Sequence, residues 1–301
     1  MISLPLFFYI EHMKKTFPLV FFLLCLASCD RFGNKDTKQE NEKRIVCISK
    51  QYSEIIFALG AQKDIVAVDI SSTYPPEIKK LPTVGYHRAL SAEGVLAAKP
   101  TLILHDNNIG PEHVVKQLEL LKIPMKVFPK GATLDSAKVL IKEIGAYFHK
   151  EQEATALCEK LDNDMSRVLE ARKSYKDTVK VLVIHYGQAN NVFLIMTKKS
   201  TAAKMIEWAG GEIAVDDEKG MKQLSAEVIA ASNPDVILLT DFGFDKLGSV
   251  EKIKELPGIA GTKAAKNNHI FRVEEHDLVY LGPRTGENTL LLQKIIHPGG
   301  N

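Results

Sequence analysis

Net charge, paired cysteines and enzyme motifs are all scarce in this chain. The formal net charge is only +2 over 301 residues, so no basic excess points to nucleic acid as a partner. There is no Gly-x-Ser-x-Gly elbow, no Walker loop and no His-Glu-x-x-His zinc helix in the sequence. These absences argue against a nucleic-acid-binding protein and against the hydrolase and nucleotidase classes that such motifs mark.

The four cysteines do not form a disulfide framework or a metal-binding pattern. Cys25 and Cys29 lie in the N-terminal segment, while Cys47 and Cys158 stand far apart in the chain and in no metal-type spacing. We expect Cys47 and Cys158 to be buried and to behave as small hydrophobic residues.

Long apolar runs are also rare, and the longest lies close to the N-terminus. A Met-Lys-Lys at residues 13–15 precedes TFPLVFFLLCLAS, which is shorter than the ~20 residues of a membrane span and is typical of a secretory signal. The run ends at Leu-Ala-Ser-Cys, which resembles a bacterial lipobox. We therefore predict a signal peptide over residues 1–28, with Met13 as an alternative start. Cys29 would be lipidated and would anchor the protein in the cell envelope, facing the periplasm or the outer side of the cytoplasmic membrane.

The rest of the chain predicts an α/β protein of two lobes. After a polar tether over residues 29–43, apolar strand-like runs alternate with helical stretches, which is typical of βαβ units with parallel strands. Residues 151–174 show helical spacing without Gly or Pro, and about 22 helical residues would span ~33 Å. We predict an N-terminal lobe over 44–150, one long rigid linking helix over 151–174, and a C-terminal lobe over 175–301.

A repeat supports the two lobes. LSAEGVLAAKPTLIL at residues 90–104 aligns without gaps on LSAEVIAASNPDVIL at 224–238, with eight identities. In each copy a Ser, Ser91 or Ser225, is suited to cap a helix, and a Glu follows where the helix dipole favours a carboxylate. The repeat predicts two similar helix-to-strand units, one in each lobe.

Three stretches resemble a known family: GYHRALSAEGVLAAKP (85–100), GMKQLSAE (220–227) and LGPRTGE (281–287). They are similar to the helical-backbone substrate-binding proteins of ABC importers, whose members carry cobalamin, siderophores or haem. The Tyr-x-Arg before the first LSAE favours the haem-specific branch. The resemblance covers residues 43–296. It implies a receptor outside the cytoplasm, not an enzyme, that delivers its cargo to a permease dimer and its ATPase.

The resemblance implies that Tyr86 is the axial ligand of the haem iron. Phenolate suits Fe(III), and because free Tyr has a pKa near ~10, the iron must displace the phenol proton. Arg88 would stabilise the phenolate, and Gly85 would let the backbone approach the porphyrin. His87 is expected to be exposed, because side chains alternate in an extended segment.

Further candidates follow a predicted strand of the C-terminal lobe. His185 and Tyr186 are alternatives for a second axial ligand or for a distal cover, and at the end of a strand in the other lobe His105 and Asp106 would line the cleft. The propionates of haem need cationic partners, and the candidates are Lys198, Lys199 and Arg284.

Glu93 and Glu227 are the acids of the two LSAE copies. The resemblance implies that they dock onto arginines of the permease, and a two-fold permease dimer would engage both of them. Stabilisation of the helix dipole by the same carboxylates is compatible with docking.

Three other functions remain open. The same fold would serve a cobalamin or ferric-siderophore receptor. A tetrapyrrole metal chelatase would need His185 to meet a carboxylate. A zinc or manganese receptor would need ligands such as His87, His105 and His185 to converge.

Overall fold

The computed structural model describes residues 42–129, 131–188 and 190–298. Lys43–Asn301 forms one compact unit. The predicted signal peptide, the alternative start at Met13, Cys29 and nearly all of the tether lie outside the described residues. Within the described ranges, no helix combines the length and the apolar character needed to cross a membrane.

The N-terminal lobe is built on a four-stranded parallel sheet in the order β2-β1-β3-β4. The strands are β1 (Ile45–Ile48), β2 (Ile65–Val68), β3 (Leu102–His105) and β4 (Met125–Lys126). The helices are α2 (Lys50–Ala58), α3 (Ala92–Ala97), α4 (Glu112–Leu120) and α5 (Leu134–Tyr147), with 3₁₀ turns at Gln62–Asp64 and Pro76–Lys80.

Helices cover both faces of this sheet, so its central strand is wholly apolar. All four residues of β1 are buried. Ile45 and Cys47 face the core shared with α2 and α5, while Val46 and Ile48 face the core shared with α3 and α4. Cys47 is a buried free thiol, and so is Cys158, as predicted.

The C-terminal lobe has a six-stranded sheet in the order β10-β9-β5-β6-β8, with β7 beside β5. The strands are β5 (Val179–Gly187), β6 (Val192–Met196), β7 (Gly211–Ile213), β8 (Met221–Gln223), β9 (Val236–Thr240) and β10 (Ile270–Val273). The pairs that β5 makes with β7 and β9 are parallel, as is β9–β10. However, β6 pairs antiparallel with both β5 and β8, so a hairpin extends the predicted parallel units.

Seven helices belong to the C-terminal lobe in the described part of the chain. They are α7 (Thr201–Trp208), α8 (Ala226–Ser232), α9 (Asp241–Leu247), α10 (Val250–Lys254), α11 (Lys263–Lys266), α12 (Glu275–Val279) and α13 (Thr285–Ile296).

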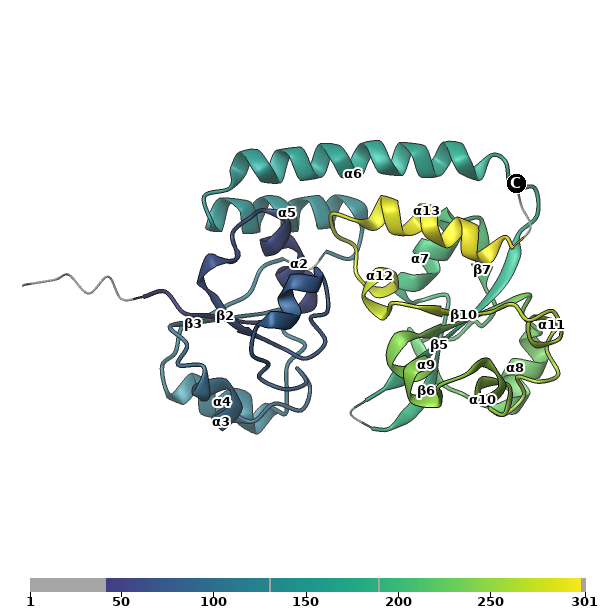
Figure 1. The fold of residues 1–301 in the computed structure, drawn as a ribbon, viewed down its shortest axis with the longest axis horizontal. Helices are drawn as coiled ribbons and strands as arrows, with labels where there is room; N and C mark the ends of the chain where they lie inside the picture. The colour runs from purple at the N-terminus through teal and green to yellow at the C-terminus, as the bar shows by residue number, and fades with distance from the viewer. Residues whose placement is uncertain (1–41, 130, 189, 299–301) are drawn as a thin grey trace, which may run out of the picture. The chain divides into compact units, whose positions relative to one another are not determined.

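One long helix, α6 (Glu151–Arg172), has the 22 residues that the sequence predicted. It packs against α5 of the N-terminal lobe and against α13 of the C-terminal lobe (Figure 1). The approach to α13 is close, because a Cβ added at Gly286 would lie 2.4 Å from the Cβ of Asp164. A single helix therefore supports both lobes along its length.

The two copies of the repeat form equivalent structures. Ser91 caps α3 by accepting a hydrogen bond from the Gly94 amide at 3.0 Å, and Ser225 caps α8 by accepting one from the Val228 amide at 3.4 Å. Each helix then leads into a strand, β3 or β9, that pairs in parallel with β1 or β5.

Candidate functional site

Tyr86 lies in a loop that is held against the end of β2. The Val84 amide donates to the Val68 carbonyl, the Ile70 amide donates to the Gly85 carbonyl, and both distances are 2.9 Å. Gly85 has φ +97°, a left-handed conformation that favours glycine. A Cβ at Gly85 would meet no protein atom within 4 Å, so within the described part of the chain it is the backbone conformation that favours glycine here.

A turn begins at Tyr86 and overturns one expectation. The Ala89 amide donates to the Tyr86 carbonyl at 2.8 Å, so His87 and Arg88 occupy the corner of a turn instead of an extended segment. His87 is consequently buried, with Nδ1 3.2 Å from Oδ2 of Asp69, and the prediction that it is exposed was wrong. Tyr86 itself is half-buried, and Arg88 is exposed.

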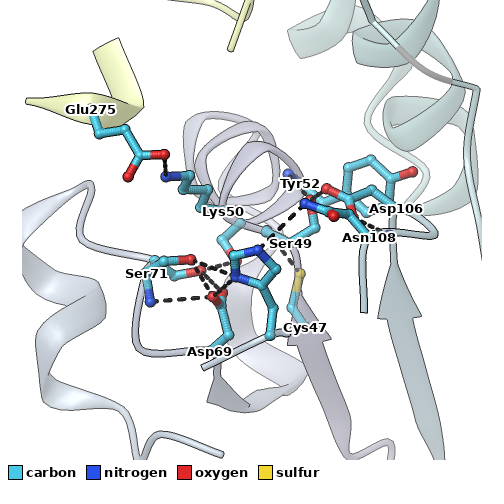
Figure 2. A network of polar contacts seen from close by, with 12 residues as sticks. Cys47, Ser49, Lys50, Tyr52, Asp69, Ser71, Asp106, Asn108 and Glu275 are labelled. Atoms are coloured by element: carbon cyan, nitrogen blue, oxygen red, sulfur yellow. Dashed lines mark hydrogen bonds and ion pairs between the residues drawn. The ribbon is translucent and has the colours of Figure 1, made fainter. Parts of the chain in front are cut away.

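An ion pair joins the two lobes near Tyr86. Nζ of Lys50, at the start of α2, lies 3.2 Å from Oε1 of Glu275, at the start of α12, as Figure 2 shows. The ammonium group of Lys50 also lies 5.0 Å from the ring centre of Tyr280. Burial opposes ionisation of Glu275, but Lys50, with smaller contributions from His185 and His87, more than offsets burial, and the pKa of Glu275 is lowered.

These charges act on the phenol of Tyr86. Burial raises the pKa of Tyr86 and the Glu275 carboxylate raises it further, while Lys50 and Arg88 act in the opposite direction with less effect. The phenol is therefore protonated at neutral pH. An incoming cation would have to displace that proton before the oxygen became an anionic ligand.

His185, at the end of β5, completes this cluster from the C-terminal lobe. Its Nδ1 lies 3.8 Å from Oε2 of Glu275 and has no hydrogen-bond partner among the described residues. Burial lowers the pKa of His185, and Glu275 offsets this only in part. The ring is therefore neutral at pH 7. We call Lys50, Tyr86, His185 and Glu275 the interlobe cluster.

Tyr186 points to the other face of β5, because neighbouring side chains of a strand alternate. Its hydroxyl donates to Oδ1 of Asn191, and its ring lies beneath the ammonium group of Lys246 at 4.9 Å. The structure thus separates the two candidates: His185 belongs to the interlobe cluster and Tyr186 does not.

Arg284 is occupied by protein groups. Its Nε donates to Oε1 of Glu54 at 2.9 Å, its Nη2 to Asp277 at 2.6 Å and its Nη1 to Asn288 at 3.1 Å. Glu54 also contacts Nε2 of His276. Because Glu54 belongs to α2 and the others to the C-terminal lobe, we call Glu54, His276, Asp277 and Arg284 the interlobe joint.

The other candidates are spread over the surface and the strand ends. Lys198 and Lys199 are exposed, and so are Glu93 and Glu227 at the starts of α3 and α8. His105 is buried at the end of β3, and burial lowers its pKa. In the described ranges, no three or more His, Cys, Asp or Glu side chains gather closely enough to hold a metal ion.

Sequence reasoning missed the acids and bases of the two lobe contacts. Lys50, Glu54 and Glu275 carry no motif, and charged residues near a helix start usually face solvent. The one available signal was the spacing of Lys50 and Glu54, which places both on one face of a helix.

The model of the periplasmic binding protein family matches residues 45–276, and the chain belongs to that family. Its solved relatives include RhuT, the periplasmic haem-binding protein of Roseiflexus sp. RS-1, in its apo form. RhuT is 31% identical with a TM-score of 0.78, over 86% of this chain and 100% of that chain.

Two curated relatives extend the comparison. The ABC transporter substrate-binding lipoprotein YvrC of Bacillus subtilis (strain 168) is 28% identical over 277 residues, which is 90% of this chain and 86% of YvrC. The vitamin B12-binding protein of Pectobacterium carotovorum subsp. carotovorum (strain PC1) is 24% identical over 210 residues, which is 69% of this chain and 75% of that protein.

Proposed function

We propose that this protein is the extracytoplasmic haem receptor of an ABC importer, and that Tyr86 binds the ferric iron. The observation that carries the proposal is a half-buried phenol on an N-terminal-lobe loop, next to a charged cluster that the C-terminal lobe completes. The likeness to a haem-binding protein over 86% of the chain supports haem as the cargo.

The chemistry of the interlobe cluster suits ferric iron. Phenolate is a hard anionic donor, and Fe(III) supplies the charge that drives the proton off Tyr86. Lys50 and Arg88 favour the phenolate form. His185 is neutral at pH 7 and offers an unprotonated ring nitrogen on the opposite lobe, as a second ligand or as a cover for the distal side. The exposed Lys198 and Lys199 supply cations for the propionates, and Arg284 contributes by holding the lobes.

The experiment is a titration of the purified protein with ferric haem, followed by absorbance, for wild type, Tyr86→Phe and Tyr186→Phe. The wild type is expected to show a ferric-tyrosinate spectrum. Tyr86→Phe should lose it, and Tyr186→Phe should keep it because that hydroxyl bonds to Asn191. A wild-type spectrum in Tyr86→Phe would remove Tyr86 from the mechanism.

A second cargo is favoured by the resemblance to a vitamin B12-binding protein. Cobalamin needs no phenolate ligand, so a parallel titration with cobalamin separates the two receptors. Saturable cobalamin binding without a haem spectrum would leave the receptor class intact and replace the cargo.

Delivery would use a lipid anchor at Cys29 and the carboxylates of the two repeats. Glu93 and Glu227 are both exposed. The pKa of Glu227 is lowered by hydrogen bonds from the backbone amide of Glu227 and from the Ser225 side chain, so this carboxylate is ionised. Glu93→Arg combined with Glu227→Arg should abolish haem uptake by cells while haem binding stays unchanged.

The control for this pair is Glu170→Arg, on the exposed face of α6. Uptake should survive in the control. Equal uptake by the double variant and the control would rule out docking through the repeats.

A further inference from the structure

A buried polar network lies at the carboxyl ends of β1, β2 and β3 (Figure 2), and one of its members, His87, contacts Tyr86. Its centre is Asp69, which directly follows β2 and has no exposed surface. The carboxylate accepts hydrogen bonds from the Ser71 amide at 3.2 Å, from the Ser71 hydroxyl and from the Ser72 hydroxyl at 2.6 Å. Nδ1 of His87 lies 3.2 Å away. With so many donors the carboxylate is fixed in place and ionised.

Asp69 in turn fixes the ring of His87. An ionised carboxylate can only accept hydrogen bonds, so Nδ1 of His87 carries a hydrogen and donates a hydrogen bond to Asp69. Nε2 then faces the side-chain amide of Asn108 at 3.4 Å, which is able to donate. Asn108 belongs to the loop after β3. The imidazole is therefore held from both sides by groups that follow β2 and β3, the two strands on either side of β1.

The fixed imidazole is in contact with Tyr86. The two ring centres lie 4.4 Å apart, with 57° between the ring planes. The backbone on either side is also pinned, since the Tyr86 carbonyl accepts from Ala89 and the His87 carbonyl accepts from Gly110, both at 2.8 Å. The freedom left to the phenol is rotation of its side chain, and the His87 ring limits that rotation.

An apolar residue would fill the place of His87 without the cost of burying a carboxylate, so packing alone does not account for the pair. We propose that Asp69 and His87 form a positioning pair, in which Asp69 orients the His87 ring and that ring orients the Tyr86 phenol toward the iron. This rests on the proposed function, in which Tyr86 is the iron ligand. Partners that orient a metal ligand without touching the metal commonly change affinity by about 10- to 100-fold when they are removed.

The test uses Asp69→Asn and His87→Phe in the full protein loaded with ferric haem. Asp69→Asn keeps the imidazole but removes the charge that fixes it, and His87→Phe keeps a ring without the anchoring nitrogen. Both variants are expected to release haem to apomyoglobin about 10-fold faster than wild type. Both should also shift the iron–phenolate bands in resonance Raman spectra.

Ser72→Ala is the matched control, because Ser72 bonds to the same carboxylate but not to His87. It should change thermal stability while release rate and Raman bands remain those of wild type. Should Asp69→Asn fail to fold, His87→Phe decides, since it leaves the carboxylate and its serine donors in place.

The outcomes separate the two proposals. If Tyr86→Phe loses the tyrosinate spectrum while both pair variants keep wild-type bands and release rates, the positioning role is refuted and the haem function stands. If Tyr86→Phe itself keeps the spectrum, the proposed function fails and the positioning role falls with it.

Discussion

Removal of Glu54 is expected to destabilise the protein strongly, because this carboxylate connects the lobes. Its side chain is 8% exposed, accepts from Arg284 at 2.9 Å and contacts His276. Removing one partner of a buried ion pair costs about 3–5 kcal/mol, since the other charge is left unpaired. In Glu54→Ala, Arg284 retains Asp277 and some solvent contact, so we expect the lower end, about 3 kcal/mol.

The measurement is thermal unfolding followed by circular dichroism. For a chain of this size about 1 kcal/mol lowers Tm by roughly 2–4 °C, so Glu54→Ala should lose roughly 6–12 °C. Glu255→Ala is the control: Glu255 also pairs with a lysine, Lys252, at 3.0 Å, but both side chains are well exposed. An exposed pair of this kind is worth less than about 1 kcal/mol.

The effect of Glu54 should also depend on pH. Burial opposes its ionisation, but His276 and Arg284 outweigh burial and lower the pKa of Glu54. A carboxyl with a lowered pKa stabilises the fold fully above its unfolded pKa, and the contribution fades as pH falls through the folded value. The gap between wild type and Glu54→Gln should therefore narrow below about pH 4. A Tm for Glu54→Ala at pH 7 equal to that of Glu255→Ala would refute the reasoning.

Two further predictions concern stability. Gly286→Ala should lower the free energy of unfolding in urea by about 1–3 kcal/mol, because the added Cβ would lie 2.4 Å from Asp164 on α6. Gly282→Ala is the control and should lower it clearly less, because a Cβ there would meet nothing within 4 Å. Equal losses in the two variants would contradict the close packing of α13 on α6. Asp241 accepts from the Glu275 amide, and burial raises the pKa of Asp241 from 3.8 to about 6. Ionisation of Asp241 therefore destabilises the fold as pH rises from about 4 to above 6. Over that range the free energy of unfolding of Asp241→Asn should rise by ~1–2 kcal/mol relative to that of wild type. If the difference in stability between the two proteins stayed constant with pH, the prediction would be contradicted.

The sequence predicts the sheets and the long helix well, because both depend on local periodicity. The apolar runs of β1, β3 and β9 lie at buried strands, and the charged-apolar spacing of residues 151–172 gives α6. The caps at Ser91 and Ser225 were also predictable, since a cap needs only the residues of its own first turn.

What the sequence does not predict depends on contacts between distant residues. Glu54 and His276 are 222 positions apart, so nothing local marks either of them as buried. The burial of His87 depends on a turn and on Asp69, 18 positions earlier, while alternation along an extended segment gave the wrong side. Helix α13 was not predicted, because its role lies in packing against α6.

The interlobe cluster and the interlobe joint both use residues of α2 and α12. A change in the position of one lobe relative to the other would therefore alter the candidate site. Lys50 and Glu54 stand one turn apart on α2, and their partners Glu275 and His276 are adjacent on α12. A displacement of α12 that separates Lys50 from Glu275 therefore also strains the contact of Glu54 with His276. Because α6 supports both lobes, small rocking motions cost less than full opening. If a ligand binds beside Tyr86 as proposed, binding and any movement of the lobes would be linked through a single turn of α2.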